Sequence, residues 1–147
     1  MQDIVFLTVR SIKVIIIDMA RKKEFDEKHV LLAAAQVFAT HGYAGTSIDQ
    51  LVKATGLLRG SLYGTFYSKA ELFNTSLRQQ LQGDDEPLLI DLVIIALLER
   101  VNVDKNVKEM IEKWIENNTS NEKNTFQDSI AARILARANL SIGEKGE

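Results

Sequence analysis

The stretch Thr46–Lys69, TSIDQLVKATGLLRGSLYGTFYSK, decides the fold of this chain. Apolar residues lie at helical spacing on both sides of one glycine: Ile48, Leu51 and Val52 before Gly56, Leu62 and Phe66 after it. The pattern predicts a short helix, a turn at the glycine, a second short helix and the start of a third. Helices this short must pack on flanking helices, as in a helix-turn-helix, whose second helix is free to enter a DNA major groove.

The composition is that of an ordinary globular chain, with 46% hydrophobic and 26% charged among 147 residues, enough for one domain or two small ones. The absence of Cys excludes disulfide frameworks, thiolate metal sites and cysteine nucleophiles, and it agrees with the reducing cytoplasm that we predict as the location. Residues 21–82 hold eight Lys or Arg against five Asp or Glu, whereas residues 83–147 hold eight against thirteen. We therefore expect only the first half to face phosphates.

Residues 1–18, MQDIVFLTVRSIKVIIID, differ from the rest of the chain. Arg10 and Lys13 interrupt the apolar run, which is too short and too charged for a membrane span and lacks the pattern of a signal peptide. Met19 stands before a basic run, like the start of a bacterial regulator. We predict that translation begins at Met19 and that residues 1–18 are a poorly packed extension; a genuine β-prone arm is the alternative.

The first helix is predicted to begin at Asp26, whose carboxylate can cap it, and to end at Gly42. Phe25 and Val30 are placed as a hydrophobic staple around this start, and the buried face continues through Leu31, Ala34, Val37 and Phe38. The basic residues before the helix, among them Lys22 and Lys23, are either a solvated terminus or contacts to DNA.

The only two histidines, His29 and His41, have no acidic or histidine partner at the spacing of a metal or catalytic site. We therefore predict that both lie on the surface, and that the chain has neither a metal site nor a cofactor. No nucleophile–base pair or phosphate loop occurs in the sequence either, so an enzyme is not predicted.

Thr46 and Asp49 form a T-x-x-D capping box, so the next helix is predicted to start near Ser47, with Thr46 as both cap and phosphate anchor. The second helix starts near Leu58 and places Arg59 in its first turn, where a guanidinium can grip guanine O6 and N7. Ser68 and Glu71 form another capping box, which puts Lys69 at a helix N-terminus where a DNA phosphate would balance its charge.

Three residues of the second helix allow more than one interpretation. Gly60 and Gly64 are poor helix formers that either let the backbone approach DNA or relieve crowding between helices. Tyr63 can bury its ring, donate its hydroxyl to a phosphate, or do both. The predicted DNA-contact set is Lys22, Lys23, Thr46, Ser47, Arg59, Gly60, Ser61, Tyr63, Gly64, Thr65 and Lys69.

Residues 30–73 resemble the DNA-binding domain of the tetracycline-repressor (TetR) family of bacterial transcription regulators. The resemblance rests on positions in fixed register: Ala34, Phe38, Gly42-Tyr43, Thr46-Ser47, Gly56, Gly60, Leu62-Tyr63, Phe66, Ser68-Lys69 and Leu72. It implies an all-helical homodimer that binds a palindromic operator and usually represses, with Thr46, Arg59, Tyr63 and Lys69 at DNA-contacting positions. The chain departs from the family at Thr65, where His is frequent, and at Leu58, where Ser or Thr often caps the recognition helix; the missing cap loses about 1 kcal/mol.

The second half begins with Asp84-Asp85-Glu86-Pro87, a strong helix start. The following residues 88–101 are apolar almost all the way round, so we expect a partner subunit to cover them. Asp104 is predicted to cap the next helix, residues 117–124 to form a polar loop, and Thr125 and Asp128 to start a last helix with Phe126, Ile130, Ile134, Leu135 and Ala138 inward.

Ile94, Met110 and Trp114 are the candidate ligand or dimer surface of this half, with a place in the core as the alternative. About three helices are expected here, where the family has five or more, so a small effector pocket, one shared across a dimer, or none are all left open.

The sequence thus predicts an all-α fold: a three-helix helix-turn-helix domain joined through a fourth helix to a small helical dimerisation and regulatory domain. The predicted boundaries are 1–18 for the extension, 19–82 for the DNA-binding domain and 83–147 for the second domain. The predicted function is a sequence-specific DNA-binding regulator, a repressor that acts as a homodimer on a palindromic operator. No membrane partner is predicted, and release from DNA by a small-molecule effector is left open. The alternative is a shortened family member that pairs with proteins and lacks specific DNA binding.

Overall fold

The computed structural model describes residues 9–118 and 126–140, and within them the side chains of all but residues 10 and 21–25. The described residues form helices joined by turns, without a strand, which confirms the predicted all-α class. The helices are α1 (Val9–Gly45), α2 (Ile48–Thr55), α3 (Arg59–Phe66), α4 (Lys69–Gln80), α5 (Glu86–Ile95), the π-helical turn η1 (Ala96–Arg100), α6 (Lys105–Asn118) and α7 (Phe126–Arg137). None of them is long and apolar enough to cross a membrane.

Helix α1 begins well before the predicted start and crosses residues 18 and 19 without a break. No Gly or Pro occurs between residues 9 and 41, so nothing ends the helical backbone there. The predicted cap at Asp26 with its Phe25–Val30 staple is therefore wrong, and so is the β-prone arm for residues 9–18. Lys22 and Lys23 lie on the helix rather than on an arm, and their side chains are outside the described set.

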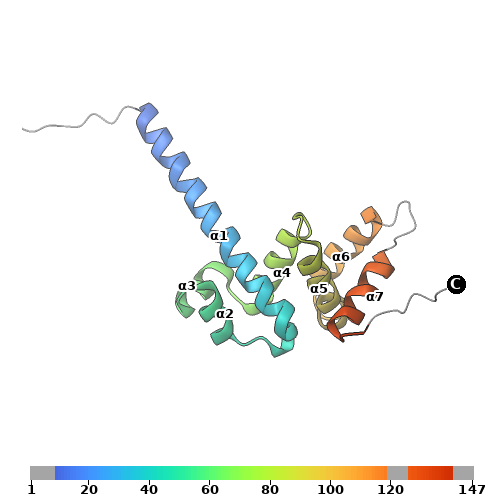
Figure 1. The fold of residues 1–147 in the computed structure, drawn as a ribbon. Coiled ribbons are helices and arrows are strands. Elements are labelled where there is room, and N and C mark those ends of the chain that lie inside the picture. Colours follow the sequence, from blue (N-terminus) through green and yellow to red (C-terminus); the bar gives the residue numbers. More distant parts are fainter. Residues whose placement is uncertain (1–8, 119–125, 141–147) are drawn as a thin grey trace, which may run out of the picture.

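The first part of α1 projects clear of the other helices, as Figure 1 shows in blue. Its apolar side chains are exposed from residue 12 to residue 19, which agrees with the poor packing predicted for the extension. The helical path changes at Gly42, whose φ of 75° lies in the left-handed region that favours glycine.

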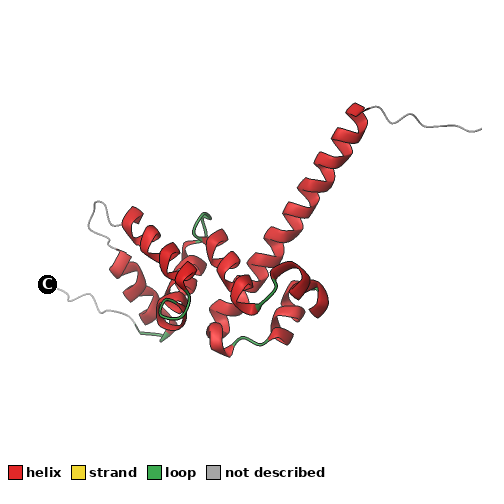
Figure 2. Ribbon diagram, turned by 180° about the vertical axis from the view of Figure 1, so that it is seen from behind, coloured by secondary structure: helices red, strands yellow, loops and turns green. Residues whose placement is uncertain are grey.

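One hydrophobic core runs through both predicted domains, with α2 and α3 on one side of α1 and α5, α6 and α7 on the other (Figures 1 and 2). Phe38 of α1 and Phe73 of α4 are fully buried and meet edge to face, their ring centroids 5.1 Å apart. Leu51 and Leu62 bring α2 and α3 onto this centre. Helix α4 contacts α1 and α3 as well as α5 and α6, and so joins the helix-turn-helix to the second half.

Helix α5 starts at Glu86, within the predicted helix start, and Asp85 caps it by accepting the backbone N–H of Leu88. The apolar residues of α5 are covered mainly by α1, α4 and α7 of the same chain, so the prediction that a partner subunit covers this helix is wrong for most of its surface. Periodicity shows that a helix is covered, but it cannot show by which chain. Ile94 is half-buried, and Leu98 of η1 is exposed.

Asp104 caps α6 through the backbone N–H groups of Asn106 and Val107, as predicted. Helix α7 buries no residue completely, and Ile134 and Ala138, predicted inward, are exposed. The first two residues of the predicted loop, 117 and 118, belong instead to α6. The rest of the predicted loop and Thr125 lie outside the described residues.

Candidate nucleic-acid interface

Ser47, and not Thr46, caps α2. The Ser47 hydroxyl accepts the N–H of Gln50, and the Gln50 side chain accepts the N–H of Ser47, which completes a capping box. The predicted Thr46–Asp49 box is therefore wrong by one residue. Thr46 is buried, and its hydroxyl donates to the carbonyl of Gly42 at 2.6 Å. A hydroxyl held in this way cannot anchor a phosphate, whereas Ser47 is exposed at the start of the helix.

The N-terminus of α3 has no side-chain cap, as predicted from Leu58, and the Leu58 side chain is 77% exposed. Arg59 follows as the first residue of the helix, and its guanidinium pairs with the carboxylate of Asp49 on α2. Both side chains of this pair are more than half exposed. The cation thus lies at the surface where α2 and α3 begin.

Gly60 and Gly64 have open space where a side chain would be, because a Cβ atom built on either meets nothing within 4 Å. Crowding between the described helices therefore does not explain these glycines. Ser61 and Thr65 on the same helix are exposed, and Tyr63 is 40% exposed, so its ring is not buried. Leu62 and Phe66 face the core as predicted. The outer face of α3 consequently carries small and polar residues.

Ser68 caps α4 through the N–H of Glu71, which confirms the predicted start at Lys69. The Lys69 ammonium already has partners: it donates to the carbonyls of Tyr43 and Thr46, each at 3.0 Å, and lies 4.5 Å from the centre of the Tyr43 ring. Lys69 is half-buried. Its first role is to hold the turn between α1 and α2, a tertiary contact that sequence spacing did not reveal.

The same turn is held from the second half of the chain. The Glu99 carboxylate of η1 accepts the N–H of Tyr43 at 3.2 Å and that of Ala44 at 2.7 Å. The Arg100 guanidinium lies 4.2 Å from the centre of the Tyr43 ring, so this ring has a cation from each half of the chain close to it. The sequence did not predict these roles for Glu99 and Arg100, whose available signal is a charged pair at the end of a long apolar run.

Asp104 ties Arg100 to α4. Its carboxylate accepts hydrogen bonds from Arg100 at 2.8 Å and from the amide of Asn74 at 3.0 Å. Burial raises the pKa of Asp104, but these hydrogen bonds and that from Val107 N–H outweigh it and leave the pKa below its usual value. The carboxylate is therefore ionised at neutral pH and fixes Arg100 beside Tyr43.

A cavity of about 490 Å³ lies between the C-terminal end of α4 and helices α5, α6 and α7. Trp114 and Phe126 line it, with ring centroids 4.9 Å apart in an edge-to-face pair. Of the other candidate ligand residues, Met110 packs half-buried against the core and Ile94 is half-buried. His29 and His41 are exposed as predicted, and no group of potential metal ligands occurs among the described residues.

The helices of the candidate interface, from the second part of α1 to the first part of α4, match a known family. Residues 30–75 fit the family described as bacterial regulatory proteins, tetR family. The chain thus carries the N-terminal helix-turn-helix domain of the tetR family. The relatives it matches are named transcriptional regulators, so the resemblance stated from the sequence is confirmed for this domain.

Individual relatives are regulators as well. The chain is 38% identical over 93 residues to the uncharacterized HTH-type transcriptional regulator YezE of Bacillus subtilis, covering 63% of this chain and 43% of that protein. It is 35% identical over 60 residues to the HTH-type transcriptional regulator AcrR of Shigella flexneri (38% and 28%). It is 42% identical over 57 residues to the HTH-type transcriptional repressor ComR of Escherichia coli (39% and 27%). The chain spans less than half the length of each of these relatives, and no solved structure matches it significantly.

Proposed function

We propose that this tetR-family chain is a sequence-specific DNA-binding regulator, a repressor that acts in the cytoplasm as a homodimer on a palindromic operator. The observation that carries the proposal is the outer face of α3, where an exposed arginine stands at the helix start and two glycines leave the backbone open. An exposed helix N-terminus with Arg in its first turn is the usual geometry for reading base edges in a major groove.

The proposed domains are residues 19–82 for DNA binding and 83–147 for dimerisation and regulation. The proposed contact set keeps Arg59 for bases, Ser47, Ser61, Tyr63 and Thr65 for phosphates, and Gly60 and Gly64 for close approach. Lys22 and Lys23 are retained for phosphates. Thr46 is withdrawn because it is buried, and Lys69 is reassigned to supporting the turn before α2.

Selection of bound duplexes from a random pool, followed by gel shift with a salt titration, tests this function. We expect enrichment of a two-fold symmetric sequence whose half-sites lie about one helical turn apart, because two recognition helices enter successive major grooves. Arg59→Ala should relax the base preference at one position of each half-site and retain binding to unselected DNA. Binding without any enriched sequence would overturn specific recognition and support the shortened, protein-pairing alternative that the uncapped α3 motivates.

An effector site is the second part of the proposal, favoured by the cavity beside Trp114. Its volume of about 490 Å³ is in the range of small-molecule sites, and its lining combines polar groups, among them Glu86 and Asn117, with apolar side chains such as Leu89. Trp114 is the only tryptophan of the chain, so its fluorescence reports directly on this cavity. A compound that changes this fluorescence and releases DNA at the same concentration would support the site; fluorescence changes without release would contradict a regulatory role.

A further inference from the structure

The ion pair between Asp49 and Arg59 joins the first turns of two different helices at the proposed reading surface. Arg59 Nη2 donates to Asp49 Oδ1 across the space between α3 and α2. Asp49 is 84% exposed and Arg59 56% exposed. An ion pair this exposed contributes little to stability, and α2 and α3 are already packed through buried Leu51 and Leu62. The fold therefore does not need the pair.

An acidic side chain at this place is unfavourable for DNA binding as such. Asp49 is prominent on the surface that carries Ser47 and Arg59, where a negative charge repels phosphates. Among the described residues the Asp49 carboxylate hydrogen-bonds to Arg59, so a favourable contribution of Asp49 to DNA binding would act through that guanidinium.

A guanidinium has five N–H donors in a planar fork, and each Nη carries two of them. Asp49 takes a single hydrogen bond at Nη2, which leaves the second Nη2 hydrogen and the Nη1 hydrogens for the two acceptors of guanine, O6 and N7. Without a partner, the long arginine side chain would sample many rotamers and would lose that freedom on binding. A carboxylate on a neighbouring helix restricts both the position and the plane of the fork.

We propose that Asp49 is a positioning residue that orients the Arg59 guanidinium for a guanine and thereby sets base specificity. This inference rests on the proposed DNA-reading function of α3. The inference predicts different effects on two kinds of DNA. Removal of the Asp49 carboxylate should lower the affinity for the preferred sequence, and should leave the affinity for any other duplex unchanged or raise it.

The test compares Asp49→Asn with wild type on two probes, the duplex enriched by wild-type protein and a shuffled duplex of equal length and composition. We expect the ratio of the two affinities to fall about tenfold, the range for a well-placed arginine–guanine contact. Asp49→Glu, which can restore a carboxylate near Nη2, should recover part of the ratio. Thermal unfolding should be nearly unchanged, which separates positioning from a structural role.

The matched control repeats Asp49→Asn in an Arg59→Ala background, where the ratio should no longer respond to residue 49. If Asp49→Asn raises both affinities equally, Asp49 merely repels DNA or withholds Arg59 from it, and the inference is overturned. It is also overturned if the ratio falls equally with and without Arg59, because Asp49 then reads a base on its own. A wild-type protein that prefers no sequence would overturn the proposed function and the inference together.

Discussion

Glu99 of η1 accepts a hydrogen bond of 2.7 Å from the backbone N–H of Ala44, 55 residues earlier in the chain. The other carboxylate oxygen, Oε1, accepts the N–H of Tyr43. This oxygen lies so close to Gly42 that a Cβ atom on that glycine would be only 2.8 Å from it. The turn that leads into α2 is thus held by a charged residue of the second half. Displacement of η1 would remove these two hydrogen bonds and leave Lys69 as the remaining anchor of the turn.

We predict that Glu99→Ala lowers the free energy of unfolding by about 1–2 kcal/mol, because two hydrogen bonds to a charged acceptor are lost while Ala44 N–H can still meet water. It should also weaken operator binding, since the turn before α2 loses one of its anchors. Urea unfolding and gel shift measure the two effects. Glu112→Ala, which removes an exposed i,i+4 partner of Lys108, is the control and should change stability by less than about 0.5 kcal/mol. Equal effects of the two variants would contradict the anchoring role.

Leu58 offers a gain in stability. Leu58→Ser should supply the missing side-chain cap of α3 and raise the free energy of unfolding by about 1 kcal/mol, because the backbone at this position is already extended, with φ −65° and ψ 149°. The exposed leucine contributes little burial that could be lost. The midpoint of urea unfolding measures the gain, and Leu58→Ala is the control without a capping oxygen. A stability of the serine variant at or below that of the alanine variant would show that the cap is not formed.

Substitution of Gly60 or Gly64 should affect stability and DNA binding in opposite directions. Alanine at either position should stabilise α3 by about 1 kcal/mol, since no other described residue approaches the new methyl group. The same methyl group should weaken binding to every duplex if the backbone approaches DNA here, so stability and affinity are expected to move in opposite directions. Urea unfolding and gel shift on the same samples test this. An alanine variant that is more stable and binds DNA as tightly as wild type would refute the close approach.

The sequence allowed prediction of the elements whose signals are local. The break in the helix at Gly42, the stop at Gly56, the caps Ser68 and Asp104, the helix start around Asp85 and the uncapped Leu58 all depend on residues within one helical turn. The error at Thr46 has the same origin: two adjacent hydroxyl residues both fit a capping pattern. Burial of one of them against the Gly42 carbonyl decides between the two, and this burial is a tertiary property.

Contacts between distant residues could not be predicted in this way. Lys69 reaches the turn before α2 from 26 residues away, and its charge alone suggested a phosphate partner where two carbonyls are found. The cover of α5 depends on α7, which is attached by ion pairs of Asp91 as well as by Phe126 and Ile130. Hydrophobic periodicity predicted the partly buried Phe126, Ile130 and Leu135 but wrongly placed Ile134 and Ala138 inward. Both cases concern polar groups that select their partners only after the helices have packed.

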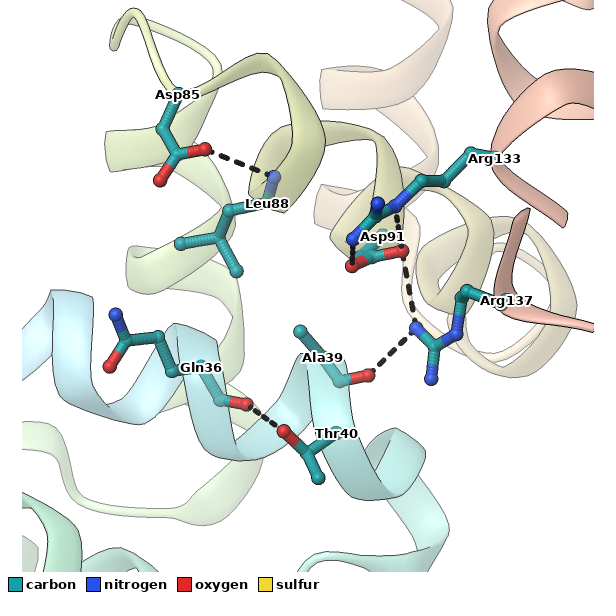
Figure 3. A network of polar contacts seen from close by, with 8 residues as sticks. All are labelled: Gln36, Ala39, Thr40, Asp85, Leu88, Asp91, Arg133 and Arg137. Atoms are coloured by element: carbon teal, nitrogen blue, oxygen red, sulfur yellow. Dashed lines mark hydrogen bonds and ion pairs between the residues drawn. The ribbon is translucent and has the colours of Figure 1, made fainter. Parts of the chain in front are cut away.

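The attachment of α7 gives a pH-dependent prediction (Figure 3). Arg133 binds both oxygens of Asp91 at 2.9 and 2.6 Å, while Arg137 lies 3.2 Å from Asp91 and donates to the carbonyl of Ala39 on α1. Burial raises the pKa of Asp91, but the hydrogen bonds and charges of the two arginines outweigh it and hold the pKa below its usual value. The stabilisation is therefore fully present above the unfolded-state pKa of about 4 and is lost as the pH falls through the lower folded-state value.

Asp91→Asn should accordingly lower the free energy of unfolding by about 2 kcal/mol at pH 7, less than the loss for a fully buried pair because both arginines keep contact with water. The difference between wild type and variant should shrink below pH 4, where the wild-type carboxyl takes up its proton. Asp104 also has a lowered pKa, but it is present in both proteins and cancels in the comparison. Urea unfolding across pH 3–7 measures the difference, and a value that stays constant over this range would show that the charge of Asp91 does not hold α7 in place.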